Sequence, residues 1–213
     1  MPIGRSYLPA AGRDIFLPLY DPITRLFGFG KALAELIDQA ALQPDNVVLD
    51  VGCGTGTLAL LIKQRHRGVE VVGLDPDPKA LARAERKTRD AGVAVSFERG
   101  FADALPFADR SFDRVFSSMM FHHLQKEDRA KALGEFHRVL KPGGRLEFLD
   151  FAGGTHNFLA QMLHGRRLNA AADERLLRRM REAGFSNANR VRTRGTLFGA
   201  IGFYEALKTV GRT

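Results

Sequence analysis

The chain has 213 residues, of which 45% are hydrophobic and 26% are charged. This length and composition predict one globular domain with a single core. The sequence has no apolar run of about 18 residues and no apolar leader followed by a small-residue cleavage site, so neither a membrane-spanning helix nor a secretory signal is predicted. With only one cysteine, Cys53, an internal disulfide is excluded and a reducing, cytoplasmic setting is favoured.

The net charge of +8 favours an acidic partner, which could be a nucleic acid, an anionic lipid or an anionic substrate. Aromatic residues are not interleaved with the basic ones, so nucleic-acid binding is disfavoured. An arginine-rich composition without any functional meaning explains the charge equally well.

Short apolar runs alternate with amphipathic segments along the chain. A helix is expected first, at about 31–41. Strands are then expected at 47–51, 69–74, 93–97, 112–117 and 145–150, and helices at 57–67, 78–91 and 126–140. The sequence Lys-Pro-Gly-Gly at 141–144 is expected to stop the last of these helices. This alternation predicts a doubly wound α/β fold with a parallel sheet.

The last third of the chain breaks the alternation. A helix at about 173–183 ends at Gly184, and two strand-like segments follow at 188–194 and 201–208. Because their connection is short, these two are expected to form an antiparallel hairpin at the sheet edge. We predict an N-terminal appendage at 1–27, which could serve as a lid, and a single domain at 28–213.

A glycine-rich turn follows the first predicted strand, in the sequence VVLDVGCGTG at 47–56. Glycines at alternate positions remove side chains where a ligand or another backbone must come close. The helix that follows would direct main-chain N–H groups toward such a ligand. Glycines can also serve only to form a tight turn, so this pattern alone does not distinguish a ligand-binding turn from a purely structural one.

Two acidic residues follow later strands at the same predicted edge of the sheet. Asp75 ends the second strand, 19 residues after Gly56, and can accept hydrogen bonds from both hydroxyls of a ribose. Asp103 follows the third strand and can accept the amino proton of an adenine, while a nearby backbone N–H donates to the ring. Either acid alone would be an ordinary helix cap or loop residue. Together with the glycine turn they predict an adenosine-containing ligand.

At these residues the chain resembles the class I S-adenosylmethionine-dependent methyltransferases, especially their type 11 and ubiquinone/menaquinone-type members. The matching segments are VLDVGCGTG at 48–56, VVGLDPDP at 71–78, FADALPFADRSFDRVFSSMMFHHL at 101–124 and LKPGGRLEFLD at 140–150. The resemblance implies a Rossmann-like seven-stranded sheet ordered 3-2-1-4-5-7-6, whose last strand is antiparallel. It also implies S-adenosylmethionine as cofactor and S-adenosylhomocysteine as product.

The resemblance also implies which residues line the cofactor site. The methionine end is expected near the glycine turn, the ribose at Asp75, and the adenine between Pro76 and Asp103. The side chain of Cys53 is expected to pack. A tyrosine in the appendage is expected to reach the cofactor carboxylate. The full set is Tyr20, Asp50, Gly52, Cys53, Gly54, Gly56, Asp75, Pro76, Asp103, Ala104, Ser118 and Met119.

Two adjacent histidines follow the fourth strand, where the active site of this fold opens. Histidine titrates near neutral pH, so His122 and His123 are candidate general bases for an acceptor that must lose a proton. They could equally shape the loop without a chemical role. A metal site is not expected, because adjacent side chains should point apart and no cysteine or carboxylate stands at ligand spacing.

The acceptor is predicted to be a small molecule or a lipid, phospholipid-like or quinone-like. The segment between the fifth strand and the final hairpin is shorter than in quinone-type relatives, which favours an open site or a lid made by residues 1–27. Arginines concentrated at 165–194 could dock on an anionic membrane surface, or could form a solvated helix face. Two alternatives remain: a nicotinamide-dependent oxidoreductase, and a module that binds S-adenosylmethionine without catalysis.

Overall fold

The computed structural model describes residues 29–152, 171–196 and 199–210. The predicted appendage at 1–27, with Tyr20, lies outside the described residues, as do Arg166 and Arg167 of the basic segment.

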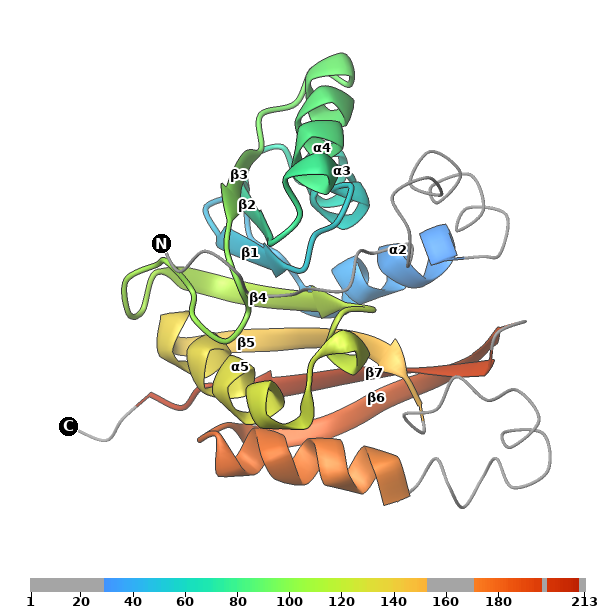
Figure 1. Cartoon of the computed structure of the whole chain (residues 1–213), viewed down its shortest axis with the longest axis vertical. Helices are drawn as coiled ribbons and strands as arrows, with labels where there is room; N and C mark the ends of the chain where they lie inside the picture. The colour runs from blue at the N-terminus through green and yellow to red at the C-terminus, as the bar shows by residue number, and fades with distance from the viewer. Residues whose placement is uncertain (1–28, 153–170, 197–198, 211–213) are drawn as a thin grey trace.

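Seven strands form one sheet in the order β3-β2-β1-β4-β5-β7-β6 (Figure 1). Neighbouring strands from β3 to β5 are parallel, and β7 is antiparallel to both β5 and β6. The predicted strand order and the antiparallel edge hairpin are therefore confirmed. The strands are β1 (Val47–Val51), β2 (Glu70–Asp75), β3 (Ser96–Arg99), β4 (Phe112–Ser118), β5 (Leu140–Phe151), β6 (Ser186–Thr196) and β7 (Gly199–Leu207).

Helices cover both faces of this sheet, as the near-continuous apolar strands require. On one face, buried side chains of α2 and α3 pack against Val48, Phe116 and Leu149. On the other face, α5 and the helix at 171–182, orange in Figure 1, pack against Val115 and Phe148. The helices are α2 (Phe29–Ala40), α3 (Thr57–Arg65), α4 (Pro78–Asp90) and α5 (Lys126–Val139), with a 3₁₀ turn η2 (Phe121–His123) before α5.

Two element boundaries differ from the sequence prediction by more than two residues. The third strand begins at Ser96 rather than at Val93, because pairing with β2 starts where Val72 meets Ser96. The Lys-Pro-Gly-Gly segment does end α5, yet it belongs to β5, which already pairs with β4 at Leu140. The register then shifts, and Gly143 adopts a φ of 80°, so these residues form an irregularity inside the strand.

Parallel strands place their carboxyl ends at one edge of the sheet. This edge carries the turn after β1, the end of β2, the loop after β3 and the segment after β4, which are the four places where the sequence placed its candidate site residues. Among the described residues, no helix is both long and apolar enough to span a membrane.

Candidate cofactor and acceptor site

The glycine turn between β1 and α3 requires glycine at each of its alternate positions. Gly52, Gly54 and Gly56 have φ values of 72°, 53° and 71°, a region that other residues adopt at a cost. A Cβ on Gly52 would lie 2.2 Å from Cγ of Met120, and one on Gly56 would lie 2.8 Å from Cβ of Ala84. The glycines therefore serve both the turn conformation and the close approach of neighbouring elements.

Strand β2 holds this turn in place. The N–H groups of Gly52 and Cys53 both donate to the Leu74 carbonyl, at 2.8 and 3.0 Å. The next turn N–H, that of Gly54, donates to Oδ2 of Asp75 at 2.9 Å. The glycine turn and the end of β2, which includes the Asp75 carboxylate, are thus joined by three hydrogen bonds.

Helix α4 supports the turn from its other end. The Lys87 ammonium donates to the hydroxyls of Thr55 and Thr57, at 3.1 and 3.0 Å. Burial raises the pKa of the Cys53 thiol well above its usual value, with Asp50 adding to the effect, so the thiol stays protonated. Its sulfur lies 2.9 Å from where a Cβ on Gly73 would stand, which agrees with the expected packing role.

Asp50 is a buried acid, 1% exposed, next to the glycine turn. Burial raises the pKa of its carboxyl to about 7, helped by the nearby charge of Asp75 and opposed by a hydrogen bond from the backbone of Ala59 in α3. Its Oδ2 has no hydrogen-bond partner among the described residues. Buried polar atoms are almost always bonded, so this oxygen is well suited to the cationic or N–H group of a ligand.

Asp75 is also buried, and its two oxygens accept main-chain N–H groups from Gly54 and Asp77, both at 2.9 Å. Burial raises the pKa of its carboxyl, and these two hydrogen bonds oppose that shift. Each carboxylate oxygen has two lone pairs, so two ribose hydroxyls could still bond there. Pro76 follows half-buried, with its carbonyl accepting Nε of Arg99 at 3.2 Å.

The loop after β3 places Asp103 half-buried and Ala104 exposed at the same edge. The Ala104 N–H donates to the Phe101 carbonyl at 3.1 Å, so it is already engaged in a local turn. A hydrogen bond from this N–H to an adenine ring would have to replace or share that bond.

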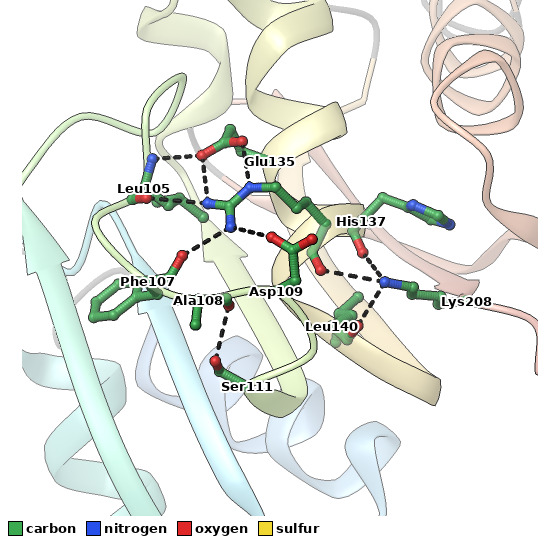
Figure 2. A network of polar contacts seen from close by, with 10 residues as sticks. Leu105, Phe107, Ala108, Asp109, Ser111, Glu135, His137, Leu140 and Lys208 are labelled. Atoms are coloured by element: carbon green, nitrogen blue, oxygen red, sulfur yellow. Dashed lines mark hydrogen bonds and ion pairs between the residues drawn. The ribbon is translucent and has the colours of Figure 1, made fainter.

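An ion-pair network anchors the chain just after Asp103 (Figure 2). Arg138 of α5 bonds both oxygens of Glu135, at 2.7 and 2.8 Å, and also the carbonyls of Leu105 and Phe107. Glu135 in turn accepts the Leu105 N–H at 2.7 Å. The hydrogen bond from Arg138, aided by that from the Leu105 N–H and by the Arg138 charge, lowers the pKa of the Glu135 carboxyl, so this anchor stays ionised at neutral pH. Helix α5 thereby fixes the loop that follows Asp103.

Strand β4 ends at Ser118, and Met119 follows with a φ of 54°, unusual for a residue with a side chain. The Met119 N–H donates to the Leu149 carbonyl at 2.8 Å. Both residues are half-buried. The next residue, Met120, is the one that lies against Gly52, so this segment borders the glycine turn.

His122 and Asp150 form a buried pair beside this segment. Nδ1 of His122 lies 2.6 Å from Oδ1 of Asp150, and the His122 backbone N–H donates to Oδ2 at 3.0 Å. The two side chains are 11% and 7% exposed. Because Nδ1 donates to a carboxylate, the lone pair of the neutral ring is on Nε2, the nitrogen that can accept a proton.

His123 is exposed, and its backbone N–H donates to the Met120 carbonyl at 2.9 Å. The expectation that the two rings point apart is wrong, since their centroids lie 4.0 Å from each other. The tight 3₁₀ turn at 121–123 brings them to one side. The described residues nevertheless contain no group of three metal-ligating side chains.

Sequence reasoning missed three contributors to this site: Asp150, Lys87 and Arg129. Asp150 carried a usable signal, because it lies in the last two residues of a strand, as Asp50 and Asp75 do. The other two are long cations on helices, and their sequence positions do not distinguish them from solvated residues.

The arginine-rich region is largely paired where it is described. Of the seven arginines at 171–194, Arg178 and Arg181 pair with acids of the same helix, at 3.8 and 3.0 Å. On β6, Arg190 pairs with Asp173, and Arg192 and Arg194 pair with Glu35 of α2. This pairing reduces the positive charge that is available to bind an anionic membrane surface.

Comparison with known proteins agrees with this geometry. Residues 48–144 match a family model described as a methyltransferase domain. The chain is 44% identical over 137 residues to a demethylmenaquinone methyltransferase of Thermus thermophilus, covering 63% of this chain and 61% of that one. It is 33% identical over 150 residues to a ubiquinone/menaquinone biosynthesis C-methyltransferase of Syntrophotalea carbinolica, covering 69% and 62%. The chain thus matches less than two thirds of the length of these relatives.

Solved structures show the same fold. A SAM-dependent methyltransferase from Methanosarcina mazei superposes with a TM-score of 0.66 at 23% identity, over 82% of this chain and 97% of that one. The YcgJ protein of Bacillus subtilis gives 0.67 at 20% identity, over 85% and 99%.

The sheet order and the solved structures thus show the Rossmann-like fold of S-adenosylmethionine-dependent methyltransferases, and residues 48–144 match a methyltransferase domain. The sequence is similar to ubiquinone/menaquinone-type methyltransferases over about 140–150 residues.

Proposed function

We propose that this chain binds S-adenosylmethionine at the carboxyl edge of β1, β2 and β3 and transfers its methyl group to a small-molecule acceptor. The observation that carries the proposal is the buried Asp50 carboxylate, whose Oδ2 has no partner among the described residues and lies beside the glycine turn. An ammonium group of the cofactor would satisfy this oxygen and offset the cost of burying its charge.

The remaining cofactor contacts follow from the strand order. The ribose hydroxyls would bond Asp75, and the adenine would lie between Pro76 and Asp103. The methionine end would then run toward Gly52, Ser118 and Met119, at the end of the neighbouring strand β4. Residues 1–27 would close over the site as a lid and bring Tyr20 to the cofactor carboxylate.

The residues around His122 support a phenolic acceptor, and quinol-type molecules are the class that the relatives' names suggest. When bound, the cofactor supplies a methyl group on a sulfonium, a good leaving group. A phenol must lose its proton before its oxygen or a ring carbon becomes a strong nucleophile. Nε2 of His122 would accept that proton, while Asp150 holds the ring and stabilises the imidazolium that forms.

The protein's other contribution is positioning. In-line displacement needs the acceptor atom, the methyl carbon and the sulfur in line, and holding reactants in this way supplies up to about 7–11 kcal/mol in well-oriented systems. Phe151 flanks the dyad, with its ring 5.1 Å from the His122 ring, and the buried Phe121 beneath the turn packs against Phe148. This apolar surrounding suits a flat aromatic acceptor.

The test is transfer of labelled methyl from S-adenosylmethionine to reduced naphthoquinone, catechol and a primary amine. Transfer to the phenols should fall about 10²-fold or more in His122→Asn, and much less in the matched neighbour His123→Asn. Equal losses in both variants would remove the base assignment. Binding of a nicotinamide cofactor would favour an oxidoreductase, and cofactor binding without transfer to any acceptor would favour a non-catalytic module.

A further inference from the structure

The short segment between β4 and α5 is held from the helix side by one residue, Arg129. Its Nε donates to the Leu124 carbonyl at 3.0 Å, and its Nη2 donates to the His122 carbonyl at 3.1 Å. Its guanidinium carbon also lies 5.7 Å from the centre of the Phe121 ring. A single side chain thus contacts two residues of η2, Phe121 and His122, and Leu124 that follows it.

Asp150 holds the same segment from the sheet side. It accepts both the backbone N–H and the ring Nδ1–H of His122, while the carbonyl of His122 goes to Arg129. The main-chain donor and acceptor of this residue are therefore both bonded to charged side chains. Asp150 holds the ring and the backbone N–H of His122, and Arg129 holds its carbonyl, so both contacts restrain the direction of the imidazole.

The placement of Arg129 is unfavourable by general rules. It lies in the fourth position of α5, close to a helix N-terminus, where the helix dipole disfavours a cation. Burial also lowers the pKa of its guanidinium, which means that its charge is partly desolvated. The planar guanidinium donates to the two carbonyls through two different nitrogens while lying over an aromatic ring, a geometry that the point-like ammonium of lysine does not match.

We propose that Arg129 is a positioning residue for methyl transfer. By holding the carbonyls of His122 and Leu124, it fixes the His122 ring so that Nδ1 donates to Asp150 and Nε2 is the nitrogen that takes the acceptor proton. The proposal rests on the proposed role of His122 as base, and it assigns Arg129 no contact with substrate.

The first test reads the tautomer of His122 without any turnover. In ¹⁵N-labelled protein, the imidazole signals of His122, identified by their loss in His122→Asn, should show a proton on Nδ1. Arg129→Lys keeps the charge and should convert these signals to a mixture of tautomers. The matched control is Arg114→Lys, which also removes donation to two main-chain carbonyls, those of Ala40 and Asp113. Because Arg114 lies in the amino half of β4, this variant should leave the His122 signals unchanged.

The second test uses transfer to reduced naphthoquinone. Arg129→Lys should lower kcat about 10-fold and leave KM for S-adenosylmethionine within about 2-fold. In a His122→Asn background, Arg129→Lys should lower kcat less than about 2-fold, because a residue that acts only through His122 cannot affect the reaction once that side chain is replaced.

The outcomes separate the two proposals. An unchanged tautomer in Arg129→Lys, or a full 10-fold effect in the His122→Asn background, would overturn the role of Arg129. Loss of the fold in both Arg129→Lys and Arg129→Gln would also overturn it, by showing a purely structural residue. A normal kcat in His122→Asn together with a changed tautomer in Arg129→Lys would overturn the base assignment and keep the positioning contact.

Discussion

The N–H of Gly54 donates a 2.9 Å hydrogen bond to Oδ2 of Asp75, across two neighbouring strand ends. This contact joins the turn expected to receive the methionine end of the cofactor to the acid expected to bind its ribose. The shape of the turn and the direction of the carboxylate therefore depend on each other.

Replacing Asp75 should accordingly have two effects. Asp75→Ala removes the ribose acceptor and also leaves the Gly54 and Asp77 N–H groups without this partner. We expect affinity for S-adenosylhomocysteine to fall about 100-fold by calorimetry, since hydrogen bonds to charged groups each contribute about 1.5–3 kcal/mol. Asp77→Ala removes the cap of α4 at Lys79 but keeps Asp75, so it should cost about 1 kcal/mol of stability and little affinity. Equal affinity losses in both variants would contradict a ribose contact.

The raised pKa of Asp50 makes cofactor binding depend on pH. With a carboxyl pKa of about 7 in the folded protein against 3.8 for a free carboxyl, the folded state holds a proton that the unfolded chain releases between these values. Below about pH 4 the protonated Asp50 carboxyl makes its full contribution to the free energy of unfolding. This contribution, about 4 kcal/mol in total, is lost as the pH rises from about 4 to about 7. A bound cation reverses this loss, because it pairs with the ionised carboxylate.

Binding of S-adenosylmethionine should therefore tighten from pH 6 to pH 8 and release a proton at pH 6. Calorimetry at pH 6 in two buffers of different ionisation enthalpy measures that release directly. Asp50→Asn should abolish it and flatten the pH dependence. Proton release unchanged in Asp50→Asn would show that another group is responsible.

Gly56 should tolerate no side chain, for two separable reasons. Its φ of 71° costs a residue with a Cβ about 1–2 kcal/mol, and the added carbon would also meet Ala84 at 2.8 Å and Phe97 at 3.2 Å. Gly92 has a similar φ of 66°, and a Cβ there would have nothing within 4 Å, so Gly92→Ala should lose stability only through the unfavourable φ. Thermal unfolding should show Gly56→Ala less stable than Gly92→Ala by about 1–3 kcal/mol. Equal unfolding midpoints of the two variants would mean that α4 shifts to accommodate the added Cβ at no cost in stability.

The dyad should depend on the charge of Asp150. Asp150→Asn keeps the size of the side chain but removes the carboxylate that accepts both N–H groups of His122. With reduced naphthoquinone as acceptor, kcat should fall about 10²-fold or more, whereas calorimetric affinity for S-adenosylhomocysteine should stay within about 3-fold. A matching loss of cofactor affinity would place Asp150 in the cofactor site instead.

Much of the fold and of the cofactor edge could be predicted from the sequence, because local patterns determine them. Alternating strands and helices require a parallel sheet, and its carboxyl edge necessarily brings together Asp50, Asp75 and Asp103. The boundaries of β3 and β5 were less predictable, since they depend on pairing register with strands far along the chain.

The acceptor side was predicted only in part, for a physical reason. The histidine pair was visible, but the bond between His122 and Asp150 spans 28 residues and arises from the register that sets Ser118 of β4 beside Leu149 of β5. Likewise, Arg129 reaches back to η2 only because α5 begins directly after the turn. Such contacts come from the three-dimensional arrangement and leave no distinctive spacing in the sequence.

The central claim is that the edge formed by the glycine turn, Asp50 and Asp75 is an S-adenosylmethionine site. Calorimetric titration of the full chain with S-adenosylhomocysteine at pH 8, beside Asp75→Ala, tests it most directly. We predict saturable one-to-one binding that is weakened about 100-fold in the variant. Absence of binding up to about 1 mM, or equal affinity in the two proteins, would contradict the claim.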